Sequence, residues 1–266
     1  MTSMDFTEVD NTLQLLHGLH GSSSSEKRKT ICNYIREKHK IAVFGYGSLL
    51  WNPIKPVDET INNCTLFGYS KGFICNDLVY RGDISFPGLT LGLQGDLTKY
   101  VKGALLIAYA DNIVPFLKAF VERETPTIIN GAKMDIYRYD FVEIEMSDGS
   151  NEYALTCIIN EESSFYLNPS LTLDEQVETM ALAYGKSGTN FQYLQKLLKT
   201  YDDHDLTDSC TDELKDLHDK IISHRQNLPL EHRKWLENYD ELKTPEERRE
   251  AATSRRLRAL TRIPAS

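Results

Sequence analysis

The pattern of apolar and polar positions changes twice along the chain, near residues 41 and 200. Between these two points, short apolar or alternating segments are separated by turn-forming residues, which is typical of β-strands. Segments 134–146 and 153–162 alternate most clearly, and the sequence Asp-Gly-Ser-Asn at 148–151 predicts a hairpin turn between them. Further strands are predicted at 41–44, 65–74, 89–97 and 103–110. Helical periodicity interrupts the strands at 112–124, 173–185 and 190–201.

The two flanking segments have a different character. The first 40 residues contain a helix candidate near Leu13–Leu16, and the run Ser22–Ser25 predicts a linker. After Asp202 the chain is highly charged and helical, and Thr244–Glu247 fits a capping box that opens a helix through Leu260. We therefore divide the chain into an N-terminal helical extension (1–40), a central domain (41–200) and a charged helical C-terminal extension (201–266).

Composition and charge narrow the class of protein. The chain has 266 residues, of which 41% are hydrophobic, and this is enough for a sizeable core. A formal charge of −9 argues against nucleic acid as a partner, because nucleic acid binds clustered Lys and Arg. No basic segment opens a signal peptide, and no apolar run approaches the roughly 18 residues of a membrane span. We expect a cytoplasmic protein with no membrane partner.

The cysteines and histidines restrict the chemistry further. The odd number of scattered cysteines, without a Cys-x-x-Cys pair, argues against a disulfide framework and against a zinc site. These cysteines are Cys32, Cys64, Cys75, Cys157 and Cys210. The seven histidines all lie outside residues 41–200, which disfavours a Ser-His or Cys-His pair and a metal site there. The acid–base group of the central domain is therefore expected to be a carboxylate, a lysine or a tyrosine.

The segment "FGYGSLLW" at 44–51 stands out because a strand runs into Gly-Tyr-Gly-Ser. Glycines permit close backbone approach and positive φ, so that successive amides converge on an anion. The segment lacks the Lys of a P-loop and the third glycine of a dinucleotide-binding turn. It is also not a nucleophile elbow, because Leu50 stands where the second glycine is required. The residues alone leave two readings open: a simple turn that ends a strand, or an anion site.

Four segments in order resemble the ChaC-like γ-glutamylcyclotransferases. "FGYGSLLW" looks like the signature of that family, and "GYSKGFICNDLVYRGDISFPGLTLGL" is similar to its Gly-Tyr, Arg-Gly and Pro-Gly stretch. "FVERE" resembles the end of the helix that supplies the family's catalytic glutamate, and "GKSGTNFQYLQKL" matches Gly-x-Ser-Gly-x-Asn-x-x-Tyr-Leu. The resemblance covers residues 41–200.

This resemblance implies a fold and a reaction. The fold is α+β, a small and mostly antiparallel β-barrel with flanking helices, to which this chain adds its helical extensions. The reaction cleaves glutathione, without metal or cofactor, into 5-oxoproline and cysteinylglycine. In it the α-amino group of the γ-glutamyl moiety attacks its own γ-carbonyl, so that a shaped pocket contributes mainly by folding the substrate correctly. A carboxylate removes the ammonium proton and passes it to the departing amine.

The resemblance also assigns roles to residues of this chain. Glu124 is the general acid and base, and Tyr46, Gly47, Ser48 and Leu49 form the loop that holds the substrate and the oxyanion. The remaining substrate-binding residues that it implies are Arg81 and Tyr193.

The residues taken alone support other roles as well. Glu122 is as good a candidate for the base as its neighbour, and both are typical of a helix surface. Tyr193 lies among leucines and fits a core position, and Arg81 fits a surface cation at a strand end.

The chain departs from the family pattern at two places. The Gly-Gly-Tyr that usually follows Arg-Glu is missing after Glu124, and Leu89 replaces the usual arginine after Pro-Gly. Pro126 restrains the residue before it to an extended conformation and so predicts that the helix ends close to Glu124. These departures keep two alternatives open: cyclisation of other γ-glutamyl peptides or amines, and a γ-glutamyl-binding module with little turnover. The long extensions suggest a protein regulator, such as thioredoxin, although the arginine-rich last helix also fits a solvated face.

Overall fold

The computed structural model describes residues 6–16, 24–125, 131 and 135–261, which form two compact units. The first unit comprises Met1–Phe73, Leu91–Tyr166 and Lys196–Glu213. The second comprises Ile74–Thr90, Leu167–Gln195 and Leu214–Ser266. Each unit is therefore assembled from segments that are distant in the sequence. Among the described residues, no helix is long and apolar enough to cross a membrane.

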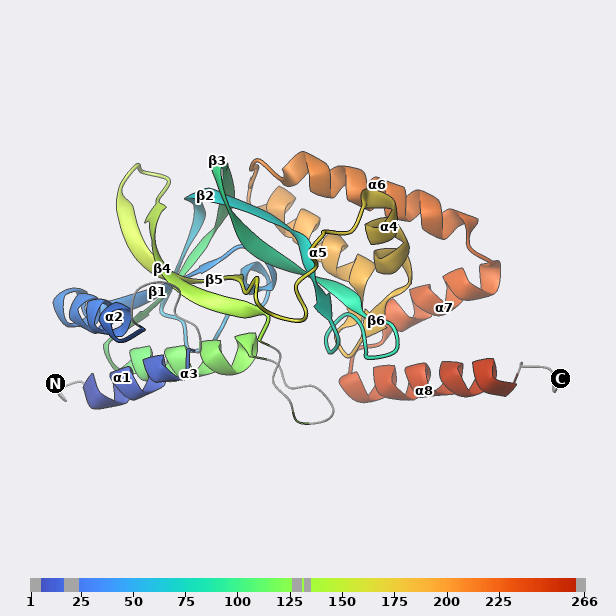
Figure 1. Ribbon diagram of the computed structural model, residues 1–266, viewed down its shortest axis with the longest axis horizontal. Helices are drawn as coiled ribbons and strands as arrows, with labels where there is room; N and C mark the ends of the chain where they lie inside the picture. The colour runs from blue at the N-terminus through green and yellow to red at the C-terminus, as the bar shows by residue number, and fades with distance from the viewer. Residues whose placement is uncertain (1–5, 17–23, 126–130, 132–134, 262–266) are drawn as a thin grey trace. The chain divides into compact units, whose positions relative to one another are not determined.

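A closed five-stranded barrel organises the first unit, with the strands in the order β1-β3-β2-β4-β5 (Figure 1). The strands are β1 (Lys40–Gly45), β2 (Glu59–Asp77), β3 (Gly88–Tyr109), β4 (Tyr137–Glu145) and β5 (Asn151–Ile159). Strand β1 pairs antiparallel with β3, β2 with β4, and β4 with β5, whereas β1 and β5 run parallel where Val43 pairs with Leu155. This barrel confirms the predicted fold class.

The predicted hairpin is confirmed in detail. Tyr137 of β4 pairs with Ile159 of β5, and the register continues to Glu145 and Asn151. In the turn the carboxylate of Asp148 accepts a hydrogen bond from the Ser150 amide at 2.9 Å. Gly149 follows with a φ of +81°, a conformation that glycine adopts without steric cost.

The strands predicted at 89–97 and 103–110 form one strand, β3, and this differs from the expectation. The polar residues around Asp96 suggested a break, and Leu97 is 96% exposed. The segment contains no proline, which would remove a backbone donor from the strand. The polarity therefore marks a solvent-exposed part of a strand rather than a turn.

Three helices supply much of the core of the first unit. They are α1 (Phe6–Gln14), α2 (Ser24–Lys38) and α3 (Ile113–Glu124), and α1 lies against both α2 and α3 (Figure 1). Val9 and Leu13 of α1 are fully buried, together with Ile35 of α2 and Phe116 of α3. The helices of the first 40 residues thus contribute core side chains. The boundaries 1–40, 41–200 and 201–266 stay predictions.

The predicted helix boundaries are close to those of the structure. Helix α3 ends at Glu124, as the proline at 126 suggested, although residue 126 itself lies outside the described residues. Ser24 and Ser25 open α2, while Ser22 and Ser23 of the predicted linker also lie outside them.

Helices dominate the second unit. It contains α4 (Leu173–Leu182), the short strands β6 (Tyr184–Gly185) and β7 (Gly188–Thr189), the start of α5 (Asn190–Asp203), most of α6 (Thr211–Asn227), α7 (Leu230–Glu241) and α8 (Pro245–Thr261). The capping box predicted for α8 is present, because the Glu247 carboxylate accepts from the Thr244 amide at 2.9 Å and the Thr244 hydroxyl accepts from the Glu247 amide at 3.1 Å.

Helix α7 packs on the β6–β7 turn within this unit. The Tyr239 hydroxyl donates to the Gly185 carbonyl at 2.9 Å, and the Asp240 carboxylate accepts from the Thr189 amide at 3.1 Å. The turn therefore depends on side chains more than 50 residues further along the chain.

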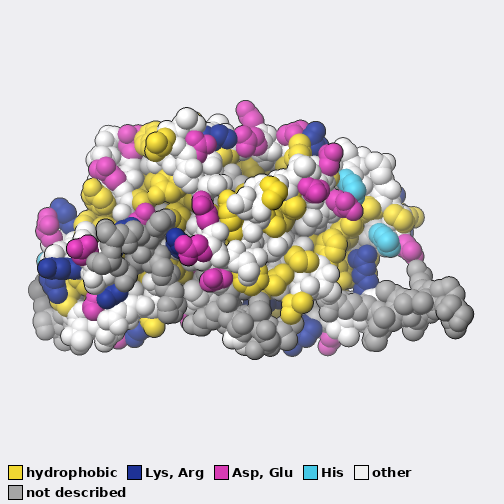
Figure 2. All heavy atoms as spheres, viewed as in Figure 1, with side chains coloured by type: hydrophobic (Ala, Val, Ile, Leu, Met, Phe, Trp, Pro, Cys, Tyr) yellow, Lys and Arg dark blue, Asp and Glu magenta, His cyan; other side chains and the backbone are white. Residues whose placement is uncertain are grey.

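On the face drawn in Figure 2, acidic, basic and apolar side chains are interspersed among the described residues.

Candidate functional site

The loop after β1 is held by hydrogen bonds at several points. Its short 3₁₀ turn, Ser48–Leu50, follows Gly47, whose carbonyl accepts from the Leu50 amide at 2.9 Å. The Tyr46 hydroxyl donates to the Cys157 carbonyl at 3.0 Å, which ties the loop to β5. Gly47 has a φ of −131°, so the loop does not use the positive φ that the two glycines suggested. The need for glycine is instead steric at Gly45, where an added Cβ would lie 2.7 Å from the Leu49 Cβ.

Glu124 is the last residue of α3, and its side chain is only 15% exposed. Burial raises the pKa of this carboxyl above its ordinary value of 4.5, because the charged form loses hydration. The neighbouring Arg123 acts in the opposite direction and lowers the pKa, with its Nε at 3.2 Å from Oε1 of Glu124. Glu122 is exposed on the same helix. The structure therefore separates the two carboxyls, because Glu124 is mostly buried and Glu122 is exposed.

Arg123 joins the carboxylate to the loop, and sequence reasoning missed this role. Its Nη2 donates to the Ser48 hydroxyl at 2.9 Å, and its Nη1 donates to the Asn52 carbonyl. A single guanidinium thus contacts Glu124 on one side and the 48–52 turn on the other. The only sequence signal for this link was the position of the arginine in the Arg-Glu pair. Tyr46–Leu49 and Glu124, which were predicted separately, are connected through it.

Tyr139 is a second residue that the sequence did not indicate. It is fully buried on β4, opposite Cys157 of β5, and its ring contacts that of Phe120 edge-on at 5.5 Å between centroids. Phe120 lies one helical turn before Glu124, so both side chains face the same way from α3. Burial raises the pKa of Tyr139, and Cys157 and Glu124 add to the rise. Among the described residues its hydroxyl has no hydrogen-bond partner.

The two other predicted site residues lie together in the second unit. Arg81 is 7% exposed, and its Nη1 donates to the Thr189 carbonyl at 3.1 Å. Its guanidinium lies 5.2 Å from the centre of the Tyr193 ring, a cation–π distance. Burial lowers the pKa of Arg81, while Tyr193 and Asp77 act in the opposite direction. Arg81 is therefore not the surface cation that its position at a strand end allowed.

The described residues contain no group of three or more His, Cys, Asp and Glu side chains that could hold a metal ion. The polar groups of the predicted site in the first unit are the mostly buried carboxylate of Glu124, the guanidinium that contacts it, and the glycine-containing loop that this guanidinium binds. Such a set can remove a proton and stabilise a developing negative charge.

Comparison with known proteins gives consistent matches. Residues 41–223 match the family described as ChaC-like protein. Over 176 residues the chain is 28% identical to the glutathione-specific gamma-glutamylcyclotransferase of Schizosaccharomyces pombe, covering 59% of this chain and 80% of that protein. It is also 28% identical over 164 residues to glutathione-specific gamma-glutamylcyclotransferase 1 of Danio rerio, covering 60% of this chain and 78% of that protein.

A solved structure matches the fold. The crystal structure of a yeast gamma-glutamyl cyclotransferase specific to glutathione aligns with a TM-score of 0.59, covering 70% of this chain and 97% of that chain. The sequence identity of this alignment is 16%, so it supports the fold and carries no statement about substrate.

Proposed function

Because the chain belongs to the ChaC-like family, we propose that it cyclises the γ-glutamyl group of glutathione and releases 5-oxoproline and cysteinylglycine. The names of its relatives in Schizosaccharomyces pombe and Danio rerio support this substrate. The observation that carries the proposal is the link through Arg123, which contacts the buried carboxylate of Glu124 and the Ser48 turn together. This link supports Glu124 as the proposed base and the adjacent loop as the proposed anion site.

In the proposed reaction the substrate supplies its own nucleophile. Glu124 takes a proton from the α-ammonium group, and the freed nitrogen attacks the γ-carbonyl carbon to form the ring bond. The bond from that carbon to the cysteine nitrogen then breaks as Glu124 passes its proton to the departing amine. Glu124 transfers the second proton of the ring nitrogen in the same way, so that the amine leaves as an ammonium group. Atoms and charges balance without water or another reactant. A raised pKa helps this base, because it brings the carboxyl closer in basicity to the amine that it serves.

The backbone amides of Tyr46–Leu49 are proposed to hold the glutamyl end and the tetrahedral oxyanion. Amides fixed before the reaction contribute about 3 kcal/mol each in comparable sites, because they need no reorganisation when charge develops. The turn meets this requirement of rigidity through its bonds to Cys157 and Arg123. Arg81 and Tyr193 are proposed as further substrate-binding residues, and their mutual contact supports a shared role.

γ-Glutamyl compounds other than glutathione are a second candidate for the substrate. Leu89 stands where the family usually has an arginine, and its side chain is 1% exposed. Its amide and carbonyl are both bound by the Asn190 side chain, at 2.5 and 2.9 Å. The chain therefore offers an apolar, buried side chain at this position instead of a cation. This difference favours γ-glutamyl peptides or amines other than glutathione as alternative substrates.

Product analysis of the full-length protein tests the proposal. Purified protein is incubated with glutathione. The products 5-oxoproline and cysteinylglycine are then separated by chromatography, and the amount of each is measured. We expect the two products in equal amounts. Parallel reactions with other γ-glutamyl amines rank the alternative substrates. Tight binding of glutathione without any product would contradict the proposal and would favour a γ-glutamyl-binding module.

We also propose a cellular compartment and a protein partner for this reaction. The five cysteines are buried and none of them forms a disulfide, which supports a reducing compartment such as the cytoplasm. A protein regulator such as thioredoxin, acting through the extensions, is the proposed partner besides glutathione. Addition of reduced thioredoxin to the glutathione assay tests this partner: a higher kcat supports it, and an unchanged kcat contradicts it.

A further inference from the structure

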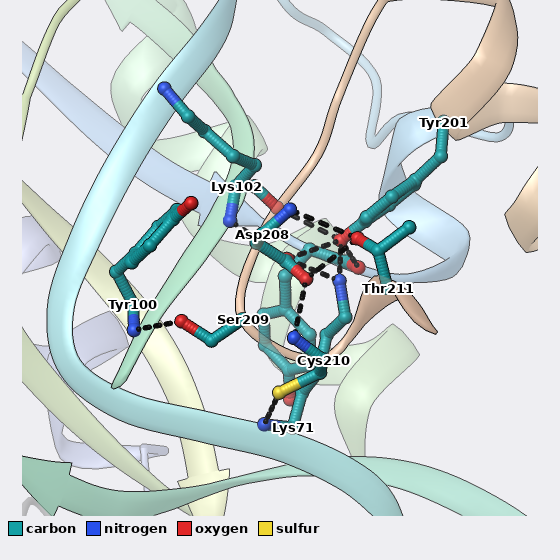
Figure 3. Close-up of polar contacts among 9 residues, drawn as sticks. Lys71, Tyr100, Lys102, Tyr201, Asp208, Ser209, Cys210 and Thr211 are labelled. Carbon is teal, nitrogen blue, oxygen red and sulfur yellow. Dashed lines mark hydrogen bonds and ion pairs between the residues drawn. The ribbon is translucent and has the colours of Figure 1, made fainter. Parts of the chain in front are cut away.

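A fully buried ion pair lies in the first unit, and neither of its residues has been assigned a role in the reaction. Nζ of Lys71 on β2 lies 2.5 Å from Oδ2 of Asp208, in the segment between α5 and α6, and both side chains have no exposed surface. Nζ of Lys71 also donates to the Tyr201 hydroxyl, which comes from α5 (Figure 3). The cluster joins residues up to 137 positions apart in the sequence.

Both oxygens of the Asp208 carboxylate accept hydrogen bonds from neighbouring backbone and side-chain groups. The Asp208 carboxylate accepts from the Lys102 amide at 3.0 Å, the Cys210 amide at 3.1 Å and the Thr211 hydroxyl at 3.0 Å (Figure 3). A buried pair of this kind loses hydration, and replacing such pairs by apolar side chains is often neutral for stability. Stability alone therefore does not account for its presence in this position.

Tyr201 connects the cluster to the loop after β1. Its hydroxyl lies 3.0 Å from the Lys102 carbonyl oxygen and 3.4 Å from the Tyr46 carbonyl oxygen. Because Lys71 donates to this hydroxyl, the single hydroxyl proton is directed to its acceptors. These are the Lys102 carbonyl, which is the nearest, and the Tyr46 carbonyl and Oδ2 of Asp208, each at 3.4 Å. Tyr46 is thus contacted at both ends, through its carbonyl by Tyr201 and through its side-chain hydroxyl by Cys157.

The contact to the Tyr46 carbonyl has a consequence for the next amide. A peptide unit is planar, and the carbonyl of Tyr46 and the N–H of Gly47 point in opposite directions from it. A group that holds the carbonyl therefore also sets the direction of the Gly47 N–H. Gly47 has no side chain, so little else at this residue opposes rotation of the peptide.

We propose that Tyr201, oriented by Lys71 and Asp208, is a positioning residue that fixes the Tyr46–Gly47 peptide and so aims the Gly47 amide at the substrate. This inference rests on the proposed function, in which the loop amides hold the oxyanion. Lys71 and Asp208 act through Tyr201, and none of the three contacts the substrate. The segment after α5 thereby becomes part of the machinery that prepares the loop.

The test is Tyr201→Phe in the full-length chain, assayed with glutathione. The variant keeps the ring and removes the hydroxyl. We expect kcat to fall about tenfold, which is less than the loss of a whole oxyanion donor, and KM to change less than threefold. This split follows because a misdirected amide weakens the transition state more than the bound ground state. A merely structural hydroxyl would lower the melting temperature and leave kcat unchanged.

Tyr34→Phe is the matched control. The Tyr34 hydroxyl donates to Glu152, which also binds Lys40, so it belongs to a similar group of tyrosine, lysine and carboxylate. Lys40 begins β1, whereas Tyr46 follows the end of that strand. We expect the control to keep the kcat of the wild-type protein. An equal fall of kcat in both variants would overturn the proposal.

A second variant guards against poor folding of the first. Lys71→Met with Asp208→Asn removes both charges together and leaves the Tyr201 hydroxyl in place without its orienting partner. We expect a fall in kcat of about threefold, again with little change in KM. Wild-type kcat in folded Tyr201→Phe, or insolubility of both variants, overturns the proposal. A wild-type protein that forms no 5-oxoproline refutes the proposed function instead, and this inference falls with it.

Discussion

The carboxyl of Glu124 is subject to two opposing influences, burial and the neighbouring guanidinium of Arg123. Burial raises its pKa from 4.5, and Arg123 at 3.2 Å reduces that rise. A base works only when deprotonated, so turnover is lost as the pH falls through this pKa. The acidic limb of the pH–rate profile is therefore expected above pH 4.5, and its position reports the balance of the two influences.

Arg123→Met should shift this acidic limb to higher pH. Without the guanidinium, only the effect of burial remains, and the pKa of Glu124 rises further. The measurement is the profile of kcat for glutathione between about pH 4 and pH 8, a range that spans the usual values of carboxyl and imidazole groups. Ser48→Ala serves as the control, because it removes a contact of Arg123 but leaves the charge beside Glu124. A limb that moves to lower pH would contradict this account.

Tyr139→Phe should leave the free energy of unfolding unchanged or raise it by up to about 1 kcal/mol. The reason is that the Tyr139 hydroxyl is buried with no partner among the residues that the structure describes, and such a group destabilises the fold. Urea unfolding measures this change. Tyr201→Phe is the comparison, since its hydroxyl has partners and its removal should lower stability by about 1 kcal/mol. A loss of stability in Tyr139→Phe would mean that this hydroxyl is hydrogen-bonded in solution.

At the residue scale, sequence motifs identify Glu124 and the Tyr46–Leu49 loop but not their neighbours. Only burial separates Glu124 from Glu122, and burial depends on which face of α3 meets the barrel. The contact of Arg123 with Ser48 joins residues 75 positions apart, so that no local pattern indicates it. Tyr139 looks like one more alternating strand residue until β4 is placed opposite β5.

At the scale of elements, α1 is the part whose contribution the sequence understates. Leu13→Ala should lower the free energy of unfolding by about 2–5 kcal/mol, because its side chain is fully buried and its loss leaves a cavity. Leu15→Ala is the matched control, since Leu15 is 48% exposed and its truncation should cost less than about 0.5 kcal/mol. Similar values for both variants in urea unfolding would contradict the packing of α1.

Helical elements could be predicted more accurately than the long strands. Proline and capping residues give local signals at helix ends, and the ends of α3 and the cap of α8 follow them. The continuity of β3 depends instead on pairing with distant strands, which overrides the local polarity near Asp96. The burial of α1 against α2 and α3 is likewise a tertiary property that helical periodicity alone does not reveal.

At the scale of the whole molecule, the reactivity of the five cysteines reports whether they are reduced thiols, as a reducing compartment requires. Burial raises the pKa of four of them, Cys32, Cys64, Cys157 and Cys210, which lowers their reactivity. The thiols of the native protein should therefore react slowly with a reagent that forms mixed disulfides. In denaturant, with no reductant added, all five thiols should react with this reagent. Fewer than five thiols in denaturant would reveal a disulfide and contradict this account.

The family resemblance predicts the central fold and leaves the rest of the chain undetermined. Its motifs end near residue 200, whereas the match to the family extends to residue 223. The ion pair of Lys71 with Asp208 could not be predicted from the sequence. Its two residues lie 137 positions apart, and no local sequence pattern indicates that they form a pair. The packing of α7 on the β6–β7 turn has the same character, with Asp240 binding Thr189.

Glu124 is the proposed base of an intramolecular cyclisation. The most direct measurement compares the rate of 5-oxoproline formation from glutathione in the wild-type protein, Glu124→Gln and Glu122→Gln. The amide keeps the shape of the carboxylate and removes its basicity, so Glu124→Gln should lose more than about 100-fold in kcat. Glu122→Gln should keep the wild-type rate because Glu122 is exposed. An active Glu124→Gln beside an inactive Glu122→Gln, or glutamate in place of 5-oxoproline as the product, would contradict the account.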